Sequence, residues 1–162
     1  MSDYVLKLIP EAREFLPPRE AAEKARILLE EFFPDGEQAE VEFSETLQFR
    51  DGGQNIEKVR CPSCQKTTEI DPFRENDIGT AWWYEFDDAL SCATDLTKLS
   101  VKMPCCGKAA SVQDIDFGNA ADFSRFELCI WNPSAENGIS AAQVAIIEEL
   151  LGCKLKQIWA HY

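Results

Sequence analysis

The sequence predicts an α+β protein: a ferredoxin-like sandwich, with the order βαβ…βαβ, that carries an inserted zinc-ribbon-like β/α module. The order strand–helix–strand occurs in the first third of the chain and again in the last third, as in a split β-α-β arrangement. The middle of the chain is too long for a structureless connection within a compact domain. It also contains four cysteines in a spacing typical of metal ligands. We therefore expect residues 1–50 and 120–162 to form one discontinuous sandwich around an inserted module at 51–119, which has one helix.

The first third supplies one strand, one helix and a second strand. Residues 4–9 form a short apolar run closed by Pro10, which predicts a strand. Pro17-Pro18 precedes a predicted helix, because proline is tolerated in a first helical turn. Residues 39–49 alternate apolar and polar side chains with one slip, which predicts a strand with a bulge. The apolar face of the helix repeats at three- and four-residue steps: Ala21, Ala25, Leu28, Leu29 and Phe32.

The last third repeats this order. Residues 123–131 are rich in aromatic and β-favouring residues, and residues 155–162 form the final predicted strand. Between them, Ser140 and Gln143 have the spacing of a capping box at a helix N-terminus. Gly152 is suited to end that helix in a left-handed conformation. The apolar stripe of the helix is predicted at Ile139, Ala142, Ile146, Ile147, Leu150 and Leu151.

Two short cysteine motifs in the inserted module predict a metal site. Cys61-Pro-Ser-Cys64 is a C-P-x-C knuckle, and Met103-Pro-Cys-Cys-Gly107 keeps its proline, last cysteine and glycine. In the second motif a methionine stands where the first cysteine would be, and Cys105 fills the neighbouring position. Four sulfur ligands with no open position describe a closed, structural Zn²⁺ site. The predicted ligands are Cys61, Cys64, Cys105 and Cys106.

Other interpretations of these cysteines stay open. Spacing alone does not separate zinc from a rubredoxin-type iron site, and the four residues could also be small buried side chains. A redox dithiol is disfavoured, because residues 65–70 continue as a strand rather than opening a helix. Cys92, Cys129 and Cys153 are expected in the core, with Cys92 as a substitute ligand if Cys105 points away. His161 is the only histidine, and a catalytic histidine would have to be this residue.

Between the two motifs, Asp71-Pro72 is predicted to start a helix that carries Trp82 and Trp83. Trp82, Phe86 and Leu90 share one face of that helix. One interpretation is that the aromatic residues pack the module onto the sandwich. The other is that Trp82 and Trp83 anchor a partner protein, because exposed tryptophan concentrates binding energy.

The formal net charge is −13, and no basic stripe is present. Such a chain repels phosphate backbones and anionic membrane faces, so neither nucleic acid nor a membrane is an expected partner. The predicted strand at 39–49 places acidic residues on its solvent face, either as a solvated edge or as a docking surface for a basic protein. The candidate docking residues are Glu37, Glu40, Glu42 and Glu45.

Several of these segments together resemble a group of uncharacterised small acidic bacterial proteins that have a C-P-x-C … P-C-C-G zinc-ribbon insert. The resemblance spans most of the chain and implies no activity. It is carried by Cys61–Cys64, Trp82-Trp83, Met103–Gly107, Phe123–Pro133 and Ile158–Tyr162. Acidic proteins of this size that are stabilised by a bound metal also resemble immunity proteins of bacterial toxin systems in size and charge.

The sequence therefore predicts a cytoplasmic, non-enzymatic, zinc-stabilised protein-binding module. An immunity or inhibitor protein for a basic partner is its most concrete form. One alternative is a cysteine-dependent redox or hydrolytic enzyme. A second alternative is a zinc-ribbon nucleic-acid adaptor, which the acidity disfavours.

Overall fold

The computed structural model describes residues 2–134 and 138–162. In this part of the chain three α-helices and an antiparallel sheet confirm the predicted α+β class. The elements are, in order, β1 (Tyr4–Pro10), α1 (Arg19–Phe32), β2 (Glu40–Asp51), β3 (Lys58–Arg60), β4 (Thr67–Glu69), α2 (Ile78–Cys92), β5 (Ser100–Lys102), β6 (Ala109–Ser111), β7 (Ala121–Trp131), α3 (Ala141–Leu151) and β8 (Leu155–His161).

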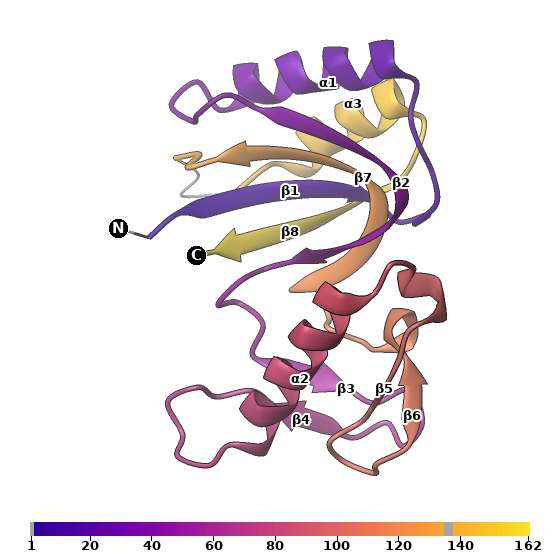
Figure 1. The fold of residues 1–162 in the computed structure, drawn as a ribbon. Coiled ribbons are helices and arrows are strands. Elements are labelled where there is room, and N and C mark those ends of the chain that lie inside the picture. The colour runs from indigo at the N-terminus through magenta and orange to yellow at the C-terminus, as the bar shows by residue number, and fades with distance from the viewer. Residues whose placement is uncertain (1, 135–137) are drawn as a thin grey trace.

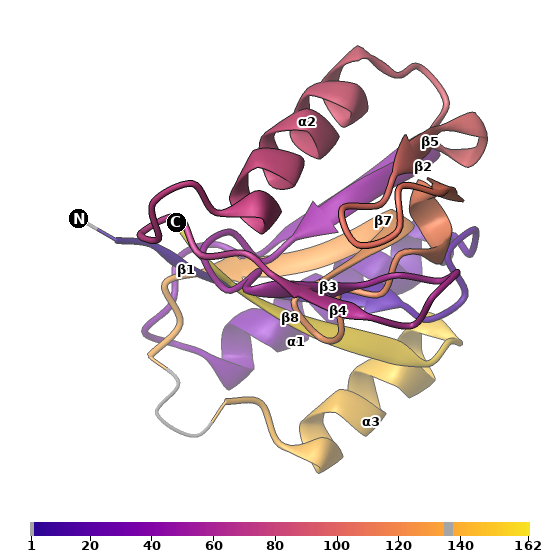
Figure 2. The ribbon, with the colours of Figure 1, turned by 90° about the horizontal axis from the view of Figure 1, so that it is seen from below.

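The main sheet has the strand order β2-β7-β1-β8, and every pair of neighbours is antiparallel. Each strand–helix–strand unit is therefore split by a strand of the other unit, with β7 between β1 and β2 and with β1 between β7 and β8. Helices α1 and α3 cover one face of this sheet (Figure 1). The segment between β2 and β7 forms a second lobe on the opposite side, which Figure 2 shows from below.

The core between the sheet and the two helices corrects the predicted helix faces. In α1 the first turn buries Ala22 rather than Ala21. In α3 the buried side chains are Val144, Ile147 and Leu151. The predicted Ala142, Ile146 and Leu150 are exposed. Helix α3 has apolar residues on more than one side, so the sequence pattern alone does not show which side is buried. Contact with the sheet and with α1 determines the buried side. Its ends follow the prediction, with a Ser140/Gln143 capping box and a left-handed Gly152.

A bulge in β2 redirects the sheet toward the second lobe. Phe43 lies opposite Phe126, yet the next paired residue, Gln48, lies opposite Ser124, so β2 gains extra residues over β7. This confirms the predicted slip, and such insertions bend a strand and increase its twist. Beyond the bulge, the end of β2 and the start of β7 curve toward the second lobe (Figure 1). There β2 contributes Phe49 and β7 contributes Phe123 to a second core.

This second core is aromatic and centres on α2. Phe86 is fully buried, and its ring centroid lies 5.1 Å from that of Trp82, 5.4 Å from that of Phe49 and 5.5 Å from that of Phe117. Because Phe49 belongs to β2 and Phe86 to α2, this cluster joins the second lobe to the main sheet. Stacked and edge-on aromatic pairs of this kind stabilise by more than their buried area alone.

Helix α2 begins later than predicted. Asp71-Pro72 does not open it; the helix starts at Ile78, and Asp77 is its N-cap. The Asp77 carboxylate accepts hydrogen bonds from the backbone N–H groups of Thr80 and Asp71, each at 2.9 Å. One carboxylate therefore caps the helix and also ties down the loop before it, which explains why the helix does not extend back to the proline.

We expect Gly79→Ala to destabilise the second lobe by about 1–3 kcal/mol. Gly79 lies buried in the first turn of α2, and an added Cβ would overlap the backbone carbonyl of Glu69 at the end of β4. Backbone cannot move aside as a side-chain tip can, so α2 would have to shift. Chemical denaturation measures the loss. Ser91→Ala, at an exposed position of the same helix, should change stability little, and equal stability of the two variants would contradict the packing described.

Candidate metal centre

Two β-hairpins carry the four cysteines. Strands β3 and β4 form one hairpin and β5 and β6 the other, each with three paired positions. Their turns are closed by the same backbone hydrogen bond. The N–H of Cys61 donates to the carbonyl of Lys66 at 2.9 Å, and the N–H of Met103 donates to the carbonyl of Lys108, also at 2.9 Å.

A second hydrogen bond and a left-handed residue repeat in both turns. Gln65 donates its N–H to the carbonyl of Cys61, and Gly107 donates to Met103, each at 3.0 Å. Gln65 has φ 64° and Gly107 has φ 69°. This conformation is easy for glycine and unusual for glutamine. The two knuckles thus have one backbone frame, in which Met103 stands at the position of Cys61.

Met103 explains why the second knuckle uses adjacent cysteines. Its side chain is 2% exposed and belongs to the aromatic core of the second lobe. The position that holds a sulfur ligand in the first turn is therefore filled by a packing residue in the second. Cys105, at the third position of the turn, supplies the missing thiol beside Cys106. Comparison of the two motifs indicates that a methionine replaces the first cysteine, and the structure shows this methionine buried in the core.

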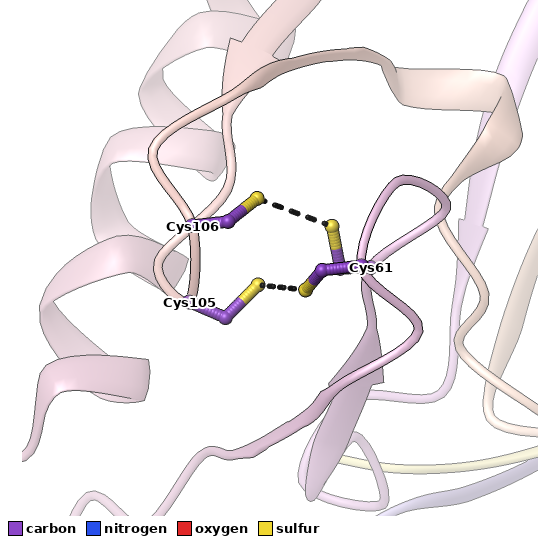
Figure 3. A group of neighbouring side chains, drawn as sticks. Cys61, Cys105 and Cys106 are labelled. Atoms are coloured by element: carbon purple, nitrogen blue, oxygen red, sulfur yellow. Dashed lines mark hydrogen bonds between the residues drawn. The ribbon is translucent and has the colours of Figure 1, made fainter.

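The four sulfurs converge from the two turns. The Sγ atoms of Cys61, Cys64, Cys105 and Cys106 all lie within 4.8 Å of one another. The sulfurs of Cys61 and Cys106 are 3.8 Å apart (Figure 3), and those of Cys64 and Cys105 are 3.3 Å apart. Four thiolates bound tetrahedrally at a metal–sulfur distance of about 2.3 Å would be separated by about 3.8 Å. The donor set and its spacing therefore fit one metal ion.

The electrostatics of the cluster favour one thiolate before a cation arrives. The backbone N–H of Cys64, with that of Ser63, lowers the pKa of Cys61 to about 6. Burial, together with the neighbouring sulfur of Cys64, raises the pKa of Cys105 to about 12. Negative charge thus collects first on Cys61, and Cys105 resists ionisation beside it. A bound cation would remove that resistance, because metal coordination deprotonates thiols.

The remaining three cysteines lie outside the cluster. Cys129 is buried, as predicted, and burial raises its pKa to about 12. Cys153 is partly buried, and burial raises its pKa to about 11. Cys92 is exposed at the last position of α2, so its predicted place in the core was wrong. It is also not needed as a substitute ligand, since Cys105 points into the cluster.

The predicted aromatic anchors have different environments. Trp82 is 5% exposed, and its indole Nε1–H donates to the carbonyl of Lys102 at 2.8 Å. Trp83 is partly buried against Phe49. The position of Trp82 favours packing, the first of the two interpretations. His161, at the end of β8, stacks its ring on that of Tyr4 with the centroids 4.5 Å apart.

Two of the four predicted docking residues around β2 already interact with other side chains of the protein. Glu42 lies 3.0 Å from the guanidinium of Arg50, a residue only 5% exposed. Glu37 accepts a hydrogen bond from the side chain of Asn132. Glu40 and Glu45 are exposed and have no ion pair within the described residues. Sequence reasoning missed the Arg50 pair, because it depends on the bulge between the two residues.

The fold and the site together define an α+β protein with a four-cysteine cluster that could hold one metal ion. No family model matches the chain, and no curated protein or solved structure gives a significant match. None of the helices in the described residues has the length and apolar character needed to cross a membrane.

Proposed function

We propose that this chain is a non-enzymatic protein-binding module whose second lobe is held together by one structural Zn²⁺. The observation that carries the proposal is the convergence of four thiols, from two turns with matching backbone frames, within 4.8 Å. A lobe built on two hairpins of three-residue strands, one α-helix and two short 3₁₀ helices has little regular structure of its own. Metal binding supplies folding free energy to such small units.

Zinc is proposed over other metals because the ligand set is all sulfur and closed. Structural zinc sites are four-coordinate and tetrahedral, and knuckles with two residues between cysteines are typical of them. A rubredoxin-type iron site is the alternative with the same ligands. The two hairpins support the description of the second lobe as zinc-ribbon-like. The antiparallel order β2-β7-β1-β8 supports the description of the rest as ferredoxin-like.

The partner in this proposal is a basic protein met in the cytoplasm. The net charge of −13 favours encounter with positive surfaces and opposes contact with phosphate backbones. All seven cysteines are free thiols within the structure, as in a reducing compartment. An immunity or inhibitor protein, which neutralises a basic toxin or enzyme by covering it, is the most concrete form of this function.

Thiol labelling together with metal analysis tests the zinc centre. We expect one zinc per chain and rapid alkylation of Cys92 alone, because Cys92 is exposed while burial keeps Cys129 and Cys153 protonated. The four cluster thiols should react only after a chelator is added. If the protein contains iron after expression in a zinc-replete medium, the metal of this site is iron rather than zinc. A chain without stoichiometric metal would refute the centre.

The same labelling separates this proposal from a cysteine-dependent enzyme. The lowered pKa of Cys61, caused first by the backbone N–H of Cys64, is what a reactive thiolate would also show. In a catalytic site Cys61 would be alkylated immediately in the protein as purified. In the proposed zinc site Cys61 is protected until the metal is removed.

A further inference from the structure

The second lobe has a groove beside α2 that the sequence did not indicate. The groove has a volume of about 1020 Å³ and lies between the segment that leaves β2, residues 53–58, the segment before α2, residues 69–74, and one side of α2 itself. Ile56 and Ile70, both largely buried, belong to its lining. Its rim carries two large aromatic side chains, of Phe73 and Tyr84.

These rim residues are unusually exposed for their size. Phe73 is 98% exposed and Tyr84 is 62% exposed. The loop that carries Phe73 is nevertheless held in place, since its backbone N–H donates to the Asp71 carboxylate at 3.0 Å. Asp71 is in turn bonded through its own N–H to Asp77. An exposed aromatic ring on a fixed backbone loses little freedom on binding, which is what a recognition anchor requires.

Helix α2 and the segment before it are acidic, whereas the groove lining itself contains three acidic residues, Glu57, Glu69 and Asp71, and two basic ones, Lys58 and Arg74. Residues 69–92 contain seven acidic side chains and one basic one, so this segment supplies a charge of −6 of the chain's −13. The single base, Arg74, lies within 4 Å of three carboxylates and leaves no net positive charge. Four acidic residues of the segment are exposed and have no ion pair within the described residues: Glu75, Glu85, Asp87 and Asp88.

We propose that this groove is where the partner binds, and that its occupant is a basic segment of the partner protein with a large aliphatic side chain placed between Phe73 and Tyr84. This inference rests on the proposed protein-binding function and places the partner-binding site beside α2 rather than around β2. Around β2, Glu42 is already paired with Arg50 and Glu37 is bonded to Asn132. On α2 itself Glu85, Asp87 and Asp88 are exposed and have no ion pair within the described residues, and the same helix carries the exposed ring of Tyr84. Apolar contact supplies affinity there, and the carboxylates select a positive partner.

The test measures the binding of short labelled peptides to the zinc-loaded chain by fluorescence anisotropy. The probe is a peptide in which Lys and Leu alternate; the matched peptides alternate Glu with Leu and Lys with Ser. We expect the Lys/Leu peptide to bind most tightly, and Phe73→Ser and Tyr84→Ala each to weaken it by about tenfold or more. Ile146→Ser, which removes an exposed apolar side chain from α3, should leave binding unchanged.

The outcomes separate this inference from the function on which it rests. Binding that survives both groove variants but is lost in a Glu40→Gln/Glu45→Gln variant would overturn the groove and leave the proposed function standing. Equal affinity for all three peptides, or no affinity for any, would overturn the groove as the site of a basic segment and leave the proposed function standing. Because Phe73 and Tyr84 are exposed, the melting temperatures of their variants should match that of the unchanged chain, which shows that lost binding is not lost folding.

Discussion

Cys106→Ser is expected to lower the metal affinity of the chain and to loosen the second lobe while the main sheet stays folded. Cys106 is exposed, so its replacement removes a ligand without opening a cavity in the core. Structural zinc contributes about 10–16 kcal/mol in zinc-finger peptides, so the loss of one of four ligands should cost about 3 kcal/mol or more. Hydrogen exchange should show faster exchange of amides in β3 to β6, with α1 and α3 unaffected.

The matched control for this experiment is Cys92→Ser. Cys92 is also an exposed cysteine of the second lobe, but it lies outside the sulfur cluster. It should therefore keep one metal per chain and the stability of the unchanged protein. Addition of a chelator to the unchanged protein should reproduce the exchange pattern of Cys106→Ser. If the two serine variants bind metal equally and melt together, the cluster is not a metal site.

Phe86→Ala is expected to cost about 3–5 kcal/mol, the usual range for loss of a fully buried phenylalanine. Phe86 is fully buried, and its ring lies against Trp82 and Phe49, so its removal leaves a cavity at the contact between α2 and the main sheet. A loss of this size is a large part of the total stability of a domain, which is about 5–15 kcal/mol. Chemical denaturation of the zinc-loaded protein measures it.

Tyr84→Ala is the matched control for the core substitution. Tyr84 lies two residues earlier on the same helix and is exposed, so its replacement should change stability by less than about 0.5 kcal/mol. Phe86→Leu, which keeps more of the volume, should fall between the two. A result in which Phe86→Ala and Tyr84→Ala are equally stable would show that α2 is not packed on the sheet as described.

The parts of the fold that sequence predicts well are those that short-range chemistry decides. The Ser140/Gln143 box and Gly152 mark the ends of α3 because capping needs particular side chains at particular positions. The C-P-x-C motif predicts its own hairpin for the same reason, and β3 and β4 pair on either side of it. The slip in β2 is also visible in the sequence, because the alternation of apolar residues changes phase there.

The parts that sequence does not predict depend on which surfaces meet. Helix α3 offers apolar residues on several sides, and only contact with the sheet and α1 decides that Ile147 is buried and Ile146 exposed. Cys92 is the last residue of α2, where the neighbouring residues Ala89 and Leu90 are apolar, yet it is exposed to solvent. The approach of the four thiols could be inferred from spacing. The exposure of Phe73 could not, since it depends on how Asp77 folds the loop.

The position of β1 in the sheet has a consequence for how this chain is made. Among the described residues β1 pairs with β7 and β8 alone, so that Leu6 lies opposite Ile130 and Trp159, and β2 pairs with β7 alone. A nascent chain that has emerged only as far as the cysteine motifs therefore displays two strands with no neighbour to pair with. Such unpaired edges invite association with other chains. During translation both strands therefore stay unpaired until β7 has left the ribosome.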